Sequence, residues 1–492
     1  ASGFVNNCVL EFCGPGIAAL PIDYRNGIDV MTTETTCLSS IWETDGVTEG
    51  FYRAHQRPED YRELHPADGA YYDKYIEIDL SKVEPMIALP FHPSNAWTIH
   101  EFLENAEELL QKVEADAKRR FPKANPQLTD KIHDGAVWAD QGVIAGCSGG
   151  LFDNITEAAD IVRGHYTGSG AFSFDVYPTS VPVSLELMKV GSTADLLASG
   201  AIIKPSFCGP CFGAGDVPAN DALSIRHTTR NFPNREGSKP GDGQLAGVIL
   251  MDARSIAATA RNHGVVTSAA DVDYDETVET NRRFDAAVYD KRVYRGFGHP
   301  QPDAALQYGP NIAEWPAIPA LSDGLLLQVA SVLRDEVTTT DELIPSGETS
   351  SYRSNPMKLA QFTLSRRDPD YVPRAKATAA LEERRAAGDT AAIRDVLAAL
   401  GLSDGDAALL HIGSVLFANK PGDGSAREQA ASCQRVLGGS ANICYEYATK
   451  RYRSNCVNWG LLPFTLAAGD AFDGAAGDFI YVPDVREKVA RG

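Results

Sequence analysis

The chain has 492 residues, 43% of them hydrophobic and 23% charged, and this composition excludes a disordered, collagen-like or fibrous protein. Since a single hydrophobic core stops growing at roughly 250–300 residues, the length predicts about three domains. The 66 acidic residues outnumber the 45 basic ones and give a formal net charge of −21, which disfavours nucleic acid and anionic membranes as ligands.

Residues 1–125 are predicted to form the first domain. Val9–Phe12 is a short apolar run that leads into a glycine-rich turn, and residues 75–80 alternate between apolar and polar side chains as a strand does. Residues 101–120 repeat apolar side chains with the period of a helix. A polar stretch with two prolines follows this helix and marks the predicted boundary.

Residues 126–325 are predicted to form the second domain. A strand over residues 143–145 ends in a loop of Gly, Cys and Ser residues. Three helices follow by periodicity, over residues 154–163, 185–198 and 255–262. Residues 296–320 are rich in Gly, Pro and aromatic residues without periodicity, and they place the second boundary near residue 325.

Residues 326–492 are predicted to form the third domain. The pattern predicts helices over residues 375–385, 391–400 and 427–436, and strands over residues 409–416 and 479–482. Because strands alternate with helices along the whole chain, the expected fold class is α/β with mostly parallel sheets. No apolar run reaches the ~18–20 residues that a membrane span requires.

Nine cysteines are scattered over this long chain, whereas a disulfide-stapled secreted scaffold is short and dense in cysteine. This pattern predicts mostly free thiols and a cytoplasmic protein. The sharpest local motif is Cys208-Gly209-Pro210-Cys211. A thioredoxin-like dithiol oxidoreductase would need a helix to continue through the second cysteine, but the glycines that follow Cys211 interrupt helices.

Two metal sites are alternatives to a redox pair. A structural zinc ion usually takes four Cys or His ligands, and the chain has no second Cys-x-x-Cys motif. An iron–sulfur cluster held by three thiolates needs one further cysteine, and Cys147 is the natural candidate because it also lies in a glycine-rich loop. Cysteines without a chemical role remain a fourth interpretation at this point.

Several segments, in chain order, resemble the aconitase family of hydro-lyases. The segments that carry the resemblance are Glu11-Phe12-Cys13-Gly14-Pro15-Gly16, residues 76–91, Gly146-Cys147-Ser148-Gly149, Cys208-Gly209-Pro210-Cys211, residues 229–235 (Thr-Arg-Asn-Phe-Pro-Asn-Arg), residues 424–429 (Gly-Ser-Ala-Arg-Glu-Gln) and Leu461-Leu462-Pro463. The resemblance implies stacked α/β domains, with a C-terminal α/β domain of the swivelling type. It also implies a hydratase or dehydratase, in some members an isomerase, that acts on a hydroxy di- or tricarboxylic acid.

The resemblance also implies the cofactor and the site residues. A [4Fe–4S] cluster with one open iron would be held by three cysteines, Cys147, Cys208 and Cys211. The implied catalytic residues are Ser425 as the base that takes a carbon-bound proton, Arg427, and Glu34 beside the cluster. The implied substrate-binding residues are Arg230 and Arg235, with Arg366 or Arg367 from the last domain. Without the family motifs, Ser425 would be interpreted as an ordinary helix N-cap.

Several positions depart from the family pattern. Ala426 replaces a second Ser, Gln429 replaces a His, and Gly149 stands where the family has Asn. Residues 351–356 replace an Asp–His segment and introduce Arg353, which suggests a divergent branch and a substrate with an added anionic group.

The family's first domain has no counterpart before residue 1. Either an N-terminal piece is cut away or supplied by another chain, or the molecule is incomplete, and we expect weak or no activity from this chain alone. The alternative function is a non-catalytic, aconitase-like protein that senses iron or redox state.

Overall fold

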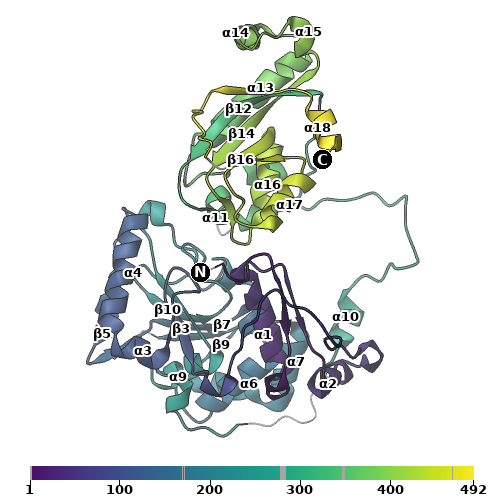
Figure 1. Cartoon of the computed structure of the whole chain (residues 1–492). Helices are drawn as coiled ribbons and strands as arrows, with labels where there is room; N and C mark the ends of the chain where they lie inside the picture. Colours follow the sequence, from purple (N-terminus) through teal and green to yellow (C-terminus); the bar gives the residue numbers. More distant parts are fainter. Residues whose placement is uncertain are drawn as a thin grey trace. The chain divides into compact units, whose positions relative to one another are not determined.

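A computed structural model describes residues 3–168, 170, 172–276, 284–345, 349–467 and 469–491 (Figure 1). The chain divides into two compact units, residues 1–301 and residues 302–492, and each unit is built around its own sheet. Both sheets are mainly parallel and are packed against helices, so the predicted α/β class is confirmed.

The first unit is organised by a seven-stranded sheet in the order β4-β3-β11-β10-β7-β8-β9. Strands β11, β10, β7, β8 and β9 run parallel, and the β3–β4 hairpin joins them antiparallel through β11. The strands are β3 (Met86–Ala88), β4 (Ala96–Thr98), β7 (Gln141–Ile144), β8 (Ser173–Val176), β9 (Ile202–Ile203), β10 (Leu223–His227) and β11 (Gly247–Met251).

Helices pack against this sheet and against one another, and α6 and α9 are in contact beside β7. The helices of this sheet region are α3 (Ile99–Glu104), α4 (Ala106–Arg120), α5 (Gly146–Gly149), α6 (Phe152–Val162), α7 (Val181–Val190), α8 (Ser192–Ser199), α9 (Ala253–Arg261) and α10 (Ala287–Arg292). Strand β11 is buried along its whole length, as expected for a strand covered on both faces. A minor antiparallel pair joins β5 (Ile132–His133) to β6 (Ala136–Val137).

The first 85 residues bury few apolar side chains. They form a two-stranded parallel sheet of β1 (Val9–Phe12) and β2 (Ser39–Trp42), with helices α1 (Ile22–Thr32) and α2 (Gly46–Ala54). The strand predicted over residues 75–80 is wrong, because this segment pairs with no strand in the described chain, and Tyr75 and Ile78 are exposed. Alternating apolar residues form a strand only where a neighbouring strand accepts their backbone hydrogen bonds.

The second unit contains a five-stranded sheet in the order β17-β16-β14-β12-β18, with β18 antiparallel to β12. Its strands are β12 (Gly324–Leu333), β14 (Leu410–Ala418), β16 (Gly439–Cys444), β17 (Leu462–Thr465) and β18 (Phe479–Val482), and a separate pair joins β13 (Thr338–Thr339) to β15 (Pro421–Asp423). Its helices are α11 (Thr340–Leu343), α12 (Pro356–Ala360), α13 (Tyr371–Ala386), α14 (Arg394–Ala399), α15 (Asp404–Ala407), α16 (Arg427–Val436), α17 (Lys450–Asn458) and α18 (Val485–Arg491).

Three predicted helices differ from the observed ones. The helix predicted over residues 101–120 is two helices, α3 and α4, which meet at Asn105 with φ −122° and ψ 21°. The helix predicted over residues 185–198 is two helices, α7 and α8, because Gly191 adopts φ 91° between them. The helix predicted over residues 391–400 begins as a 3-10 turn and becomes α-helical only at Arg394.

One sheet contains strands from both sides of the predicted boundary at residue 125, since β3 and β11 are hydrogen-bonded neighbours. The division into domains 1–125, 126–325 and 326–492 stays a prediction.

Candidate active site

Cys147 lies where strand β7 turns into the short helix α5. Ala145 is extended, and Gly146 adopts φ 77°, a left-handed conformation that glycine tolerates best. A Cβ on Gly146 would lie 2.7 Å from the Sγ of Cys211. The absence of that Cβ therefore lets the main chain before Cys147 approach the thiol of Cys211.

Cys208 and Cys211 lie at the two ends of one tight turn. Residues Gly209–Cys211 form a 3-10 turn, and the Cys211 amide donates to the Cys208 carbonyl at 3.1 Å. A hydrogen bond with Cys208, burial and the neighbouring charges of Cys208 and Cys147 raise the pKa of Cys211. Burial and the charge of Cys208 raise the pKa of Cys147. The structure thus brings the three predicted cysteines within electrostatic reach of one another.

The three cysteines supply soft sulfur donors, which favour iron–sulfur clusters over hard cations. The structure describes all nine cysteines, and each is a free thiol. Within the described residues, no group of three or more His, Cys, Asp or Glu side chains has the arrangement of a site for one metal ion.

Arg230 and Glu34 form an ion pair beside these thiols. The Nη2 of Arg230 lies 2.5 Å from the Oε1 of Glu34, and the two side chains are 18% and 6% exposed. The charge of Arg230 counteracts the raised pKa of Cys147, which places the guanidinium near that thiol. The Nε of Arg230 is buried and has no hydrogen-bond partner among the described residues. This arginine therefore keeps an unused donor in a buried position.

Arg235 lies within electrostatic reach of Cys211. Its side chain is buried, and its charge opposes the upward shift in the pKa of Cys211. Asn231 fixes the loop that carries both arginines, because its Nδ2 donates to the carbonyls of Ala88 (3.1 Å) and Leu89 (2.8 Å) at the end of β3. Two guanidinium groups and three thiols from distant parts of the sequence thus meet in the first unit.

Sequence reasoning gave no role to Asn231. In the sequence, Asn231 is only an amide side chain within an apolar and basic segment. The structure shows that it is 1% exposed. His227 is the last residue of β10. Its main-chain carbonyl accepts from the Ala145 amide at 3.2 Å, and this contact ties the cysteine turn to the sheet.

The structure places Ser425 directly before the N-cap of α16. The N-cap residue is Ala426, which has no side-chain cap. The Ala426 amide donates to the Oγ1 of Thr340 at 3.2 Å, so a neighbouring helix satisfies that amide. Ser425 is half-buried in the turn after β15. The alternative interpretation of Ser425 as the helix N-cap is therefore wrong.

The remaining predicted arginines also lie in the second unit. Arg427 is the first residue of α16 and is half-buried. Arg367 forms ion pairs with Asp335 and with Glu342, the latter at 3.4 Å. Arg366 is half-buried. The structure thus engages the guanidinium of Arg367 with two carboxylates.

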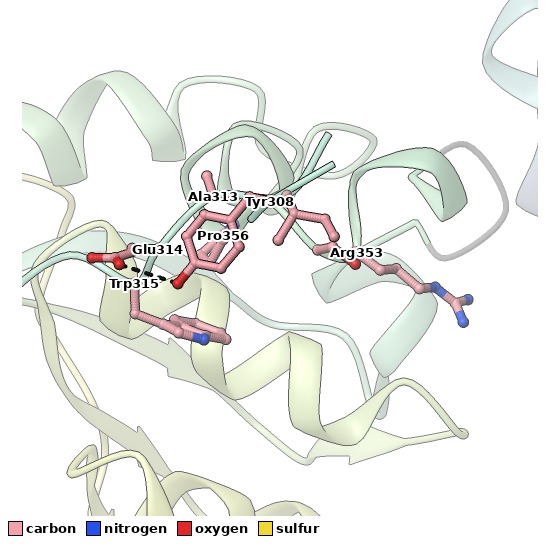
Figure 2. A pocket seen from close by; sticks show the side chains of 8 residues that line it. Tyr308, Ala313, Glu314, Trp315, Arg353 and Pro356 are labelled. Carbon is pink, nitrogen blue, oxygen red and sulfur yellow. Dashed lines mark hydrogen bonds between the residues drawn. The ribbon is translucent and has the colours of Figure 1, made fainter. Parts of the chain in front are cut away.

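A cavity of about 550 Å³ lies on the second unit, lined by residues including Tyr308, Trp315 and Arg353. Figure 2 shows the Tyr308 hydroxyl directed at Glu314, to which it donates at 3.1 Å, and the guanidinium of Arg353 pointing away from these side chains. The ring of Trp315 packs on the ring of Trp459 with centroids 4.4 Å apart. Neither Ser425 nor Arg427 lines this cavity.

Comparisons with known proteins bear mainly on the first unit. A family model described as "Aconitase family (aconitate hydratase)" matches residues 1–258. Curated relatives include the 2,3-dimethylmalate dehydratase large subunit of Eubacterium barkeri, 29% identical over 50% of this chain and 51% of that protein. They also include the 3-isopropylmalate dehydratase large subunit of Clostridium kluyveri, 27% identical over 50% of this chain and 51% of that protein.

The mitochondrial homoaconitase of Debaryomyces hansenii is 27% identical over 51% of this chain and 34% of that protein. The chain thus spans about half the length, or less, of the curated relatives it matches. A solved structure of a 3-isopropylmalate dehydratase, leuD, from a Methanocaldococcus species aligns with 33% of this chain and 72% of that one, at 19% identity and a TM-score of 0.20. No helix in the described part of the chain is long and apolar enough to cross a membrane.

Proposed function

The chain belongs to the aconitase family, and from that premise we propose that it is a hydro-lyase that reversibly removes water from a hydroxy di- or tricarboxylic acid. The observation that carries the proposal is the meeting of three thiols with Arg230 and Arg235 in the first unit. Two curated relatives are named as dehydratases of substituted malates, which are hydroxy dicarboxylic acids.

In this proposal Cys147, Cys208 and Cys211 hold a [4Fe–4S] cluster. When bound, such a cluster supplies a Lewis acid at its iron without a protein ligand, which makes hydroxide a better leaving group. The cysteine turns contribute rigidity, because the left-handed Gly146 and the hydrogen-bonded turn at Gly209–Cys211 limit how far the sulfurs move.

Arg230 and Arg235 are proposed to bind the substrate carboxylates. A guanidinium presents a planar fork of donors that matches a carboxylate. Glu34 holds one side of Arg230, which leaves its buried Nε for another acceptor. Arg366 or Arg367 is proposed to bind a further carboxylate of the substrate.

Ser425 is proposed as the base that removes the carbon-bound proton. Its turn ends in the N-terminus of α16, where backbone N–H groups and Arg427 favour negative charge on an oxygen.

A separate partner chain is the last part of the proposal, together with a cytoplasmic location. The relatives matched over half of their length include proteins named as large subunits, a name that implies a second chain. We propose that a second chain completes the active site here too. A cluster-containing chain that turns over no hydroxy acid, with or without such a partner, would instead support the iron- or redox-sensing alternative.

The test starts with anaerobic purification, analysis of iron and sulfide, and an absorbance spectrum. We expect about four irons per chain by analogy with a [4Fe–4S] cluster, and their loss in Cys147→Ser, Cys208→Ser and Cys211→Ser. Cys13→Ser is the control, because Cys13 is also exposed. Turnover of a panel of hydroxy di- and tricarboxylic acids follows. Zinc alone, or no metal, in the wild-type chain contradicts the proposal.

A further inference from the structure

Arg226 is a buried arginine on strand β10, four residues before Arg230, and its side chain is only 1% exposed. A buried guanidinium is strongly destabilising unless its N–H groups find acceptors. The acceptors of its N–H groups therefore show which parts of the chain Arg226 holds together. Since it is sealed from solvent, Arg226 is not placed to bind a substrate.

The guanidinium of Arg226 joins the sheet to the cysteine turn. Its Nε donates to the Oγ of Ser224 at 2.8 Å, and its Nη2 donates to the Oε1 of Gln141 at 3.0 Å. Both acceptors lie on the sheet and are themselves joined, because Ser224 Oγ donates to Gln141 Oε1 at 2.7 Å. Strands β7 and β10 therefore hold these two acceptors in place.

The other two acceptors are main-chain carbonyls on either side of Cys211. Nη1 donates to the Pro210 carbonyl at 2.8 Å, and Nη2 donates to the Asp216 carbonyl at 2.7 Å. Pro210 lies between Cys208 and Cys211, and Asp216 lies five residues after Cys211. The single guanidinium of Arg226 thus binds both ends of the segment from Pro210 to Asp216. A lysine ammonium lacks the planar fork of donors that this arrangement uses.

The charge of Arg226 also reaches the cysteine. Among its charged neighbours, Glu236, which is 2% exposed, most favours the charged form of the Arg226 guanidinium. Cys211 has the next largest effect of this kind. A positive charge near a ligating sulfur stabilises the more negative, reduced form of an iron–sulfur centre, and the charge around a cluster is one determinant of its potential. The geometry and the charge therefore act on the same sulfur.

We propose that Arg226 is a positioning residue that holds the Cys208–Cys211 turn in the geometry that binds the cluster and raises the reduction potential of that cluster. This inference rests on the proposed function, since it names how the same site is held. The inference goes beyond the proposed function because Arg226 touches neither the substrate nor the cluster in this scheme. It acts through Pro210, Asp216 and Cys211.

The experiment compares Arg226→Lys and Arg226→Gln with wild type. Arg25→Lys is the matched control, because Arg25 is also buried, at 2% exposed, and donates to the carbonyls of Ile17 and Leu20 and to the carboxylate of Asp45. The full chain is reconstituted anaerobically, and its cluster potential and rate of iron release to a chelator are measured. Alkylation of Cys208 and Cys211 by iodoacetamide in the iron-free chain is followed by mass spectrometry.

We expect both Arg226 variants to release iron, and to be alkylated at Cys208 and Cys211, about tenfold faster than wild type, as the loss of charged hydrogen bonds implies. We expect a lower cluster potential in Arg226→Gln, and wild-type values in Arg25→Lys. If Arg226→Gln does not fold, Ser224→Ala removes one anchor and should show a smaller change in the same direction. Wild-type potential and release rate in the folded variants overturn the inference. A wild-type chain without cluster refutes the proposed function itself, and the alkylation rates then report separately on the turn.

Discussion

Replacing Gly149 by alanine is expected to destabilise the first unit by about 3 kcal/mol. Gly149 is the last residue of α5, two residues after Cys147, and it is buried. A Cβ there would lie 3.0 Å from the carbonyl carbon and 3.0 Å from the Cβ of His227, and closer still to the carbonyl oxygen. The His227 carbonyl belongs to a central strand and accepts from Ala145, so it cannot rotate away. Overpacking of this kind typically costs ~1–3 kcal/mol, and a main-chain neighbour favours the upper end.

Gly27→Ala is the matched control for Gly149→Ala. Gly27 lies inside α1, and a Cβ there would have its nearest neighbour, the Ser148 carbonyl oxygen, at an ordinary 3.8 Å. Alanine is favoured over glycine inside a helix by about 0.8–1.0 kcal/mol, so this variant should be slightly more stable than wild type. Urea unfolding followed by circular dichroism measures both variants. If Gly149→Ala unfolds at the urea concentration of wild type, the steric argument for glycine at this position is refuted.

Three further predictions concern side chains. Glu34→Gln should raise the KM for the substrate about tenfold, since a charged hydrogen bond that orients Arg230 contributes ~1.5–3 kcal/mol, and an unchanged KM would contradict this. Burial tends to raise the pKa of Glu382, but hydrogen bonds from Arg385 and His411 outweigh it and hold that pKa at about 2. Its stabilisation of up to ~3 kcal/mol is therefore complete above pH ~4.5 and is lost as the pH falls towards 2, and Glu382→Gln should abolish that acid dependence in pH-dependent urea unfolding. Ser425→Ala should lower kcat at least about 100-fold, as the loss of a base does, without changing the iron content, whereas equal kcat values for Ser425→Ala and wild type would remove Ser425 from catalysis.

Local sequence patterns predicted some elements at their observed limits. The helix Arg427–Val436 and the strand Phe479–Val482 have the predicted limits. The helix buries Ala430, Ala431 and Cys433, and every residue of the strand is half-buried. The predicted strand over residues 75–80 has the right alternation, but no neighbouring strand of the described chain pairs with it.

The candidate site was predictable only in part. Motifs with a fixed spacing pointed to Cys147, Cys208 and Cys211, and these cysteines lie together in the first unit. Arg226 could not be found in this way, because one arginine in an apolar strand looks like an exposed edge residue. Its role depends on where Pro210 and Asp216 lie in space. Hydrogen bonds between segments far apart in the sequence leave no local pattern.

The antiparallel attachment of the β3–β4 hairpin to β11 has a consequence for biosynthesis. Residues 86–98 are made about 150 residues before Gly247–Met251, the strand that β3 pairs with. At a translation rate of roughly 5–20 residues per second, the edge of this hairpin stays unpaired for about 10–30 s. The unpaired segment contains Ile87 and Leu89, which are buried in the folded protein. A nascent chain in this state exposes apolar surface on a free strand edge, which is the kind of surface that chaperones bind. The first half of the chain therefore cannot complete its sheet until the cysteine turns, Arg230 and Arg235 have been synthesised.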